Sequence, residues 1–147
     1  MTSGALPELN QIQKLLPHRY PFLLVDRITA LELQKTISGI KNITYNEWYF
    51  QGLPAALRVV PASILSEAIA QLGAMLILLE EQNRGKLIFF LGLDRVRFRR
   101  PVRPGDTLSM SAEILRRKGR FGRLRVEAKV DGHRVFGGIM QFALEGP

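Results

Sequence analysis

The longest apolar stretch of the chain, Ala62–Leu79, predicts one buried helix. At 100° per residue, aliphatic side chains fill most of the helix surface, while Ser63, Glu67 and Gln71 share one narrow polar face. Glu67 is the only charged residue of the stretch, and Pro61 stands directly before it, where proline favours the opening of a helix. We therefore expect a central helix that carries a single acid into the core.

The segments on either side of this helix show strand-like patterns separated by turn residues. Before it, we expect a short helix, two strands and a loop, at Glu8–Leu16, Phe22–Ile28, Thr36–Thr44 and Gln51–Pro61. After it, we expect four strands that can form an antiparallel meander, at Leu87–Arg99, Thr107–Arg117, Arg120–Asp131 and Val135–Leu144. This order indicates an α+β fold, in which a curled antiparallel sheet wraps around one long central helix.

Length and composition are typical of one domain. With 147 residues and 46% hydrophobic content, we expect a single core over residues 1–147. The first ten residues lack the pattern of a secretory signal, and Glu67 and Gln71 interrupt the apolar helix, so a cytoplasmic protein without membrane insertion is expected. The chain has no cysteine and only two histidines, which excludes disulfides and thiol nucleophiles and argues against a metal centre.

The chain is strongly basic, with a net charge of +8, and its arginines concentrate after residue 94. Alternation places Arg95, Arg97 and Arg99 on one face of a strand. Such a surface suits an acidic protein, an anionic membrane or nucleic acid. Nucleic acid is the least favoured partner, because few aromatic residues lie near the arginines and no nucleic-acid-binding motif is present. A solvated strand edge, protected from aggregation by its charge, is the alternative.

Four groups of residues carry the motifs of a known family: Leu16–Arg27 (LPHRYPFLLVDR), Thr44–Gly52 (TYNEWYFQG), Pro61 with Glu67–Gln71 (EAIAQ), and Phe98–Asp106 (FRRPVRPGD). Through them the sequence resembles, over nearly its full length, the β-hydroxyacyl-acyl carrier protein dehydratases of bacterial fatty acid synthesis, which belong to the hotdog superfamily. The resemblance implies a hotdog fold, dimers assembled into a trimer of dimers, and an acyl tunnel where two subunits meet. It also implies dehydration of a (3R)-hydroxyacyl thioester to the trans-2-enoyl form, with no cofactor and no metal.

This reaction needs a base for the α-proton and an acid that protonates the departing hydroxide. In the family these groups are a histidine in a Gly-His-Phe-Pro segment and a glutamate on the central helix, contributed by opposite subunits. Glu67 matches the glutamate and is the expected catalytic residue. Counting back from Glu67 without a gap places Leu53 at the histidine position, and leucine can neither accept nor donate a proton.

The residues around this position also differ from the family pattern. Pro54 follows Leu53 directly, and Ala62 stands where the family has a glycine. The Ala62 N–H can still serve an oxyanion at the start of the helix, although its methyl group adds bulk that glycine lacks. We expect Pro54, Ala62 and Gln71 to form the oxyanion and substrate-binding group.

The resemblance also suggests a partner for the basic strand. Acyl carrier proteins are acidic and must dock beside the tunnel mouth to deliver a chain linked to phosphopantetheine. We expect four arginines to make this contact: Arg97, Arg99, Arg100 and Arg103.

Other side chains are weaker candidates for the missing base. His18 lies in the Pro-His-Arg-Tyr-Pro turn and is interpreted as a structural residue of that turn, with recruitment as a base as a minor alternative. His133 lies in a predicted hairpin tip and is expected to be solvated. Tyr45 and Tyr49 are close in sequence to the altered loop, but a tyrosine of ordinary pKa, about 10, is a poor base at neutral pH.

Three functional hypotheses remain open. The first is a divergent dehydratase of fatty acid or specialised lipid biosynthesis that keeps Glu67 and has altered or weak activity. The second is a non-catalytic or half-catalytic subunit that binds acyl chains and pairs with a complete paralogue. The third is an acyl thioesterase in which Glu67 activates water or attacks the thioester carbonyl.

Overall fold

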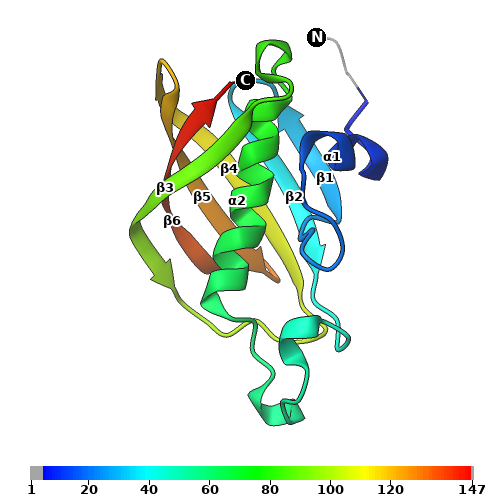
Figure 1. The fold of residues 1–147 in the computed structure, drawn as a ribbon. Helices are drawn as coiled ribbons and strands as arrows, with labels where there is room; N and C mark the ends of the chain where they lie inside the picture. Colours follow the sequence, from blue (N-terminus) through cyan, green and yellow to red (C-terminus); the bar gives the residue numbers. More distant parts are fainter. Residues whose placement is uncertain (1–4, 147) are drawn as a thin grey trace.

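A computed structural model describes residues 5–146 and shows a six-stranded antiparallel sheet curled around one long helix (Figure 1). The helices are α1 (Leu9–Leu15) and α2 (Ala62–Leu78), with short 3-10 turns η1 (Trp48–Phe50), η2 (Ala55–Leu57) and η3 (Glu81–Asn83). The strands are β1 (Arg27–Glu32), β2 (Thr36–Asn42), β3 (Leu87–Phe98), β4 (Thr107–Lys118), β5 (Phe121–Val130) and β6 (His133–Glu145). The predicted α+β fold, with a curled antiparallel sheet around a central helix, is confirmed.

The order of the strands differs from the predicted meander in one respect. All four strands predicted after α2 are present, but β3 pairs with β6 at one edge of the sheet, whereas β4, β5 and β6 follow one another. Residues 99–106 contain Pro101 and Pro104 and do not form a hairpin between β3 and β4. They pass the N-terminal end of α2 instead, where the N–H of Val60 donates to the carbonyl of Val102 at 2.8 Å.

The first predicted strand is only partly correct. Strand pairing begins at Arg27, so most of the predicted Phe22–Ile28 segment lies outside the sheet. Its backbone finds a different partner, because the N–H of Leu24 and the carbonyl of Phe22 both bond to the side chain of Gln71 on α2. A side chain of the helix therefore replaces a neighbouring strand.

The central helix is buried along its second half and open at its start. Every residue from Ala68 to Leu78 is buried against the sheet and the connecting segments, as the apolar pattern predicts. The first turn differs, because Ala62 and Ser63 are exposed. Among residues 5–146, no helix is long and apolar enough to cross a membrane.

Two glycines allow the helix to lie close to the sheet. A Cβ on Gly39 of β2 would lie 2.7 Å from the carbonyl oxygen of Arg27 and 2.8 Å from Cδ1 of Leu72. A Cβ on Gly73 of α2 would lie 2.7 Å from Cδ1 of Leu124 on β5. The two contacts differ in kind, because the first meets a backbone atom of a paired strand and the second meets only the end of a side chain.

Gln71 links α2 to the segment before β1. Its side chain is 1% exposed. Oε1 accepts the N–H of Leu24 at 2.8 Å, and Nε2 donates to the carbonyl of Phe22 at 2.8 Å and to Oε1 of Glu67 at 2.9 Å. The two backbone contacts fix which way the amide points, so the group that reaches Glu67 is a donor.

We predict that Gly39→Ala lowers the free energy of unfolding by about 1–3 kcal/mol, because the new methyl group meets backbone that pairs with β1. Gly73→Ala should stay within about 1 kcal/mol of the wild type, because Leu124 can shift its end and alanine favours a helix over glycine by about 1 kcal/mol. Urea unfolding of both variants measures the difference. Equal losses in the two variants would contradict this account of the helix-to-sheet contact.

We also predict that Gln71→Met lowers the free energy of unfolding by about 1–3 kcal/mol, because methionine fills the volume but leaves the buried N–H of Leu24 without an acceptor. Gln13→Met is the matched control, since Gln13 is exposed on α1 and should change stability little. The urea midpoint at unchanged slope reports the effect. A Gln71→Met protein as stable as its control would show that the amide bonds contribute no net stability.

Candidate functional site

The Glu67 carboxylate lies on the polar face of α2, one turn before Gln71. Its side chain is 31% exposed, so the acid is less buried than the apolar pattern of the helix predicts. The first turn of α2 next to it is open, since Ala62 and Ser63 are exposed. Among residues 5–146, Oε1 receives the Gln71 N–H and no donor reaches Oε2, so one carboxylate oxygen is held and the other is free.

His18 lies directly beside this acid. Its Nε2 is 3.3 Å from Oε1 of Glu67, and its ring stands 6.0 Å from the ring of Phe22. The sequence did not predict this contact, and whether His18 is a structural residue or takes part in the reaction stays a prediction. The structure supplies an imidazole next to the helix acid, from a position outside the segment where the resemblance places the family histidine.

The surroundings of His18 distinguish its two ring nitrogens. Its Nδ1 is buried and has no hydrogen-bond partner among the described residues, whereas Nε2 faces the carboxylate. A proton on Nδ1 would be a buried donor without an acceptor, so the tautomer of the neutral ring with its proton on Nε2, the nitrogen nearest Glu67, is the better satisfied one. Nε2 of His18 is thus the ring nitrogen that lies beside the carboxylate.

The position predicted for the family histidine carries no titratable group. Leu53 is 37% exposed in the turn between η1 and η2, where its carbonyl accepts Nε of Arg58 at 3.0 Å. Pro54 is also exposed and precedes η2, with its carbonyl bonded to the N–H of Leu57 at 2.9 Å. Figure 1 shows this teal loop beyond the N-terminal end of α2.

The start of α2 offers free backbone donors. The N–H groups of Ile64 and Leu65 both donate to the carbonyl of Pro61, which leaves those of Ala62 and Ser63 outside the helical ladder. These exposed donors lie at the positive end of the helix dipole. The geometry is consistent with the predicted oxyanion role of Ala62, which stays a prediction.

Tyrosine is further disfavoured as a base. Burial raises the pKa of Tyr49 well above its ordinary value, and the charges of Glu47 and Asp26 raise it further. Its hydroxyl has no hydrogen-bond partner among the described residues. Tyr45 is exposed, with the guanidinium of Arg58 5.6 Å from its ring centroid.

The structure gives different surroundings for the four arginines predicted to contact a carrier protein. Arg97 and Arg99 line a pocket beside β5 and β6. Arg103 contacts η2 instead, where its Nη1 donates to the carbonyl of Ala56 at 3.3 Å. Arg100 is exposed between them.

A pocket of about 1580 Å³ lies along α1, the C-terminal end of α2 and the start of β3. Its lining includes Pro17 and Arg19 on either side of His18, but not Glu67. The acyl tunnel that the resemblance implies is therefore not outlined by this cavity and stays a prediction for an assembled protein. Among the residues that the structure describes, no three imidazole or carboxylate groups are placed to share a metal ion.

Comparisons with known proteins agree with the motifs. Residues 16–138 match the FabA-like domain family. Two relatives named 3-hydroxyacyl-acyl-carrier-protein dehydratase FabZ, from Bacillus velezensis and Bacillus subtilis, are each 47% identical over 137 residues. The matched region covers 93% of this chain and 97% of each relative.

Solved structures show the same fold at low sequence identity. The dehydratase heterocomplex ApeI:P from Xenorhabdus doucetiae has a TM-score of 0.74 at 17% identity, covering 92% of this chain and 91% of that chain. A mutant thioesterase from Pseudomonas aeruginosa has a TM-score of 0.71 at 14% identity, covering 94% of both chains. A hot-dog-like protein from Thermanaerovibrio acidaminovorans has a TM-score of 0.63 at 14% identity, covering 76% of this chain and 81% of that chain. This chain therefore has the hotdog fold and belongs to the FabA-like domain family.

Proposed function

We propose that this protein slowly dehydrates (3R)-hydroxyacyl thioesters carried by an acyl carrier protein, in fatty acid or specialised lipid biosynthesis. The names of relatives at 47% identity support the reaction class. The observation that carries the residue assignment is the 3.3 Å contact between Nε2 of His18 and Oε1 of Glu67. No cofactor or metal enters the proposed reaction.

In this proposal Glu67 transfers the protons and His18 is a positioning residue. His18 and Gln71 both hold Oε1, which leaves Oε2 to take the α-proton of the substrate. The carbon–oxygen bond then breaks, and the same carboxyl group returns the proton to the departing hydroxide as water forms. The N–H groups at the start of α2 stabilise the thioester oxygen while it carries negative charge.

A single carboxyl group that does both transfers should be slower than a pair. Loss of a positioned general base typically lowers the rate by about 10²–10⁴. One group must then serve as both base and acid, and its pKa cannot suit both proton transfers. Leu53 is the residue that removes the second group from the site. The proposal therefore combines the reaction of the family with weak activity.

The open polar face of α2 supports assembly with a second subunit. In the part of the chain that the structure describes, the edge strand β3 pairs with β6 on one side only, and it exposes several large apolar side chains: Leu87, Phe89, Phe90, Leu91 and Leu93. A long apolar edge of this kind favours pairing with another sheet. We propose a dimer that pairs along β3, with the trimer of dimers as its higher assembly.

Docking of the carrier protein is proposed at the loop end of the molecule. Arg103 contacts η2 and Arg100 is exposed beside it, so both lie near the open start of α2. A thioester delivered there would arrive close to the free N–H groups of that helix. Arg97 and Arg99 line the pocket beside β5 and β6, and we do not include them in the proposed contact with the carrier protein.

The activity prediction uses leucine-to-histidine variants in one loop. We expect slow formation of the 2-enoyl product by the wild type, none by Glu67→Gln, and a gain on the order of 10²-fold for Leu53→His. Leu57→His is the matched control, since Leu57 is an exposed leucine of the same loop and should give no gain. Ultraviolet absorbance of the enoyl thioester and mass spectrometry of the carrier measure the rate.

The same assay separates the other two hypotheses. Release of free acid that disappears in Glu67→Gln would indicate a thioesterase and contradict the dehydratase. Turnover only after a complete paralogue is added would indicate a half-catalytic subunit.

His18→Gln should lower kcat, leave KM nearly unchanged and alter the pH profile, because the imidazole beside Glu67 is lost. A variant that failed to fold would instead lose substrate binding.

The carrier contact predicts salt dependence. Exposed charges are screened over about 10 Å at 0.1 M salt, so affinity for an acyl carrier protein should fall as salt is added. Arg100→Gln with Arg103→Gln should weaken binding severalfold at low salt and flatten this dependence, whereas Arg84→Gln with Arg116→Gln, two exposed arginines elsewhere, should change it little. Fluorescence anisotropy of a labelled carrier measures both effects. An affinity unaffected by salt would argue against this surface.

A further inference from the structure

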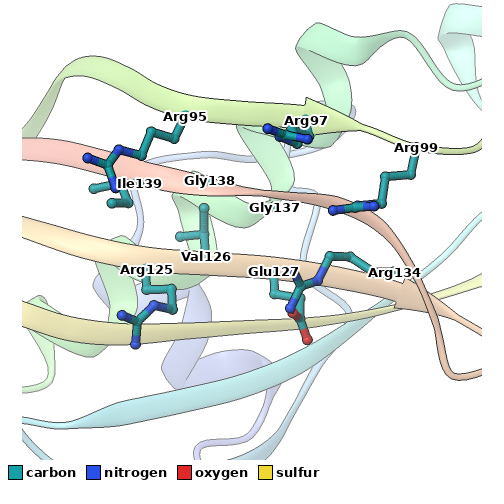
Figure 2. A pocket seen from close by; sticks show the side chains of 10 residues that line it. All are labelled: Arg95, Arg97, Arg99, Arg125, Val126, Glu127, Arg134, Gly137, Gly138 and Ile139. Carbon is teal, nitrogen blue, oxygen red and sulfur yellow. The ribbon is translucent and has the colours of Figure 1, made fainter.

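A second concave site lies on the sheet face turned away from α2. Figure 2 shows arginines from β3 and from the neighbouring strands β5 and β6 projecting over this face, with α2 behind the strands. The pocket has a volume of about 260 Å³. Its charged lining consists of five arginines and one glutamate: Arg95, Arg97, Arg99, Arg125, Arg134 and Glu127.

The single glutamate does not neutralise this group. Although burial opposes its ionisation, a hydrogen bond from Lys129 and the charge of Arg134 outweigh that effect and hold the pKa of Glu127 below its usual value. Glu127 is therefore an ionised carboxylate already occupied by two cations. The negative charge of Glu127 is therefore largely compensated by Lys129 and Arg134 and does little to neutralise the other arginines of the pocket.

Three arginines of the pocket lack an acidic partner. Arg125 pairs with Glu113 at 2.8 Å outside the pocket. Among residues 5–146, no carboxylate lies within 4.0 Å of the guanidinium nitrogens of Arg95, Arg97 or Arg99. Like charges collected on one strand face repel one another, and a bound anion would relieve that repulsion.

The backbone beneath the arginines keeps the pocket open. Gly137 and Gly138 of β6 form its floor (Figure 2). The pairing of β3 with β6 shifts between Asp94 and Arg97, and Arg95 has a φ of 53°, which is the geometry of a β-bulge opposite Gly138. A Cβ on Gly137 would lie 3.4 Å from Cδ of Arg134, so any side chain there would begin to fill the space.

We propose that this pocket binds a compact phosphate-bearing anion, such as a phosphomonoester or a diphosphate. Arginine is suited to phosphate because its planar guanidinium donates two parallel hydrogen bonds. Drug-sized ligands occupy pockets of about 300–1000 Å³, so this volume suits one or two phosphate groups better than a whole nucleotide. The site goes beyond the proposed dehydration and does not depend on it, since Glu67 and His18 take no part.

The test is calorimetric titration of the purified protein with inorganic pyrophosphate at fixed ionic strength. We expect saturable binding with one site per chain. Arg97→Gln with Arg99→Gln should weaken it about tenfold or more, because two charged donors are lost. Arg84→Gln with Arg116→Gln is the matched control, since it removes the same charge from exposed arginines outside the pocket and should change the affinity little.

A second variant tests the shape of the pocket without changing its charge. Gly137→Ala should weaken pyrophosphate binding severalfold, because the methyl group raises the floor beneath Arg134. Thermal unfolding checks that each variant folds. Equal losses in the two double variants, or binding that never saturates, would overturn the proposal by showing a general charge effect.

Competition then identifies the source of the phosphate. Displacement of pyrophosphate by an acyl carrier protein with phosphopantetheine, but not by the carrier without it, assigns the site to the phosphodiester of the carrier. If neither form displaces pyrophosphate, the ligand is a free phosphate compound. Absence of pyrophosphate binding together with tight binding of both carrier forms would overturn the proposal in favour of a protein-docking surface.

Discussion

The rest of the candidate site depends on the buried amide of Gln71. This one side chain accepts a backbone N–H, donates to a backbone carbonyl and donates to Glu67, so it joins three parts of the chain. An amide can do this because it has both an acceptor and two donors, whereas a carboxylate or a hydroxyl has fewer donors. Gln71 carries no proton in the proposed reaction. It nevertheless sets the distance between the helix and the segment that follows His18.

Much of the fold could be predicted because periodicity reports which face of an element is buried. The uninterrupted apolar run predicted α2, and turn residues separated the four strands that follow it. Periodicity does not report which strands are neighbours. The pairing of β3 with β6 is decided by the path of residues 99–106 past the start of α2, which the strand pattern does not contain.

The candidate site was predictable for its acid but not for the neighbour of that acid. Glu67 stood out as the only charge in an apolar run. His18 is far from it in sequence and lies in a turn, where no periodicity shows what the ring will face. The exposure of Glu67 was also missed, because the composition of one helix does not show how much of its surface the other segments cover. A search of the sequence for a side chain able to pair with Glu67 on the polar face of α2 could have pointed to His18.

The position of β3 has a consequence for the order in which the protein can be completed on the ribosome. Among residues 5–146, β3 pairs in the sheet with β6 alone, and β6 is synthesised after both β4 and β5. At about 5–20 residues per second, β3 waits some seconds for that partner. During this interval none of the other strands in residues 5–146 takes the place of β6 beside β3, so the apolar side chains of β3 are vulnerable to wrong association until β6 has emerged.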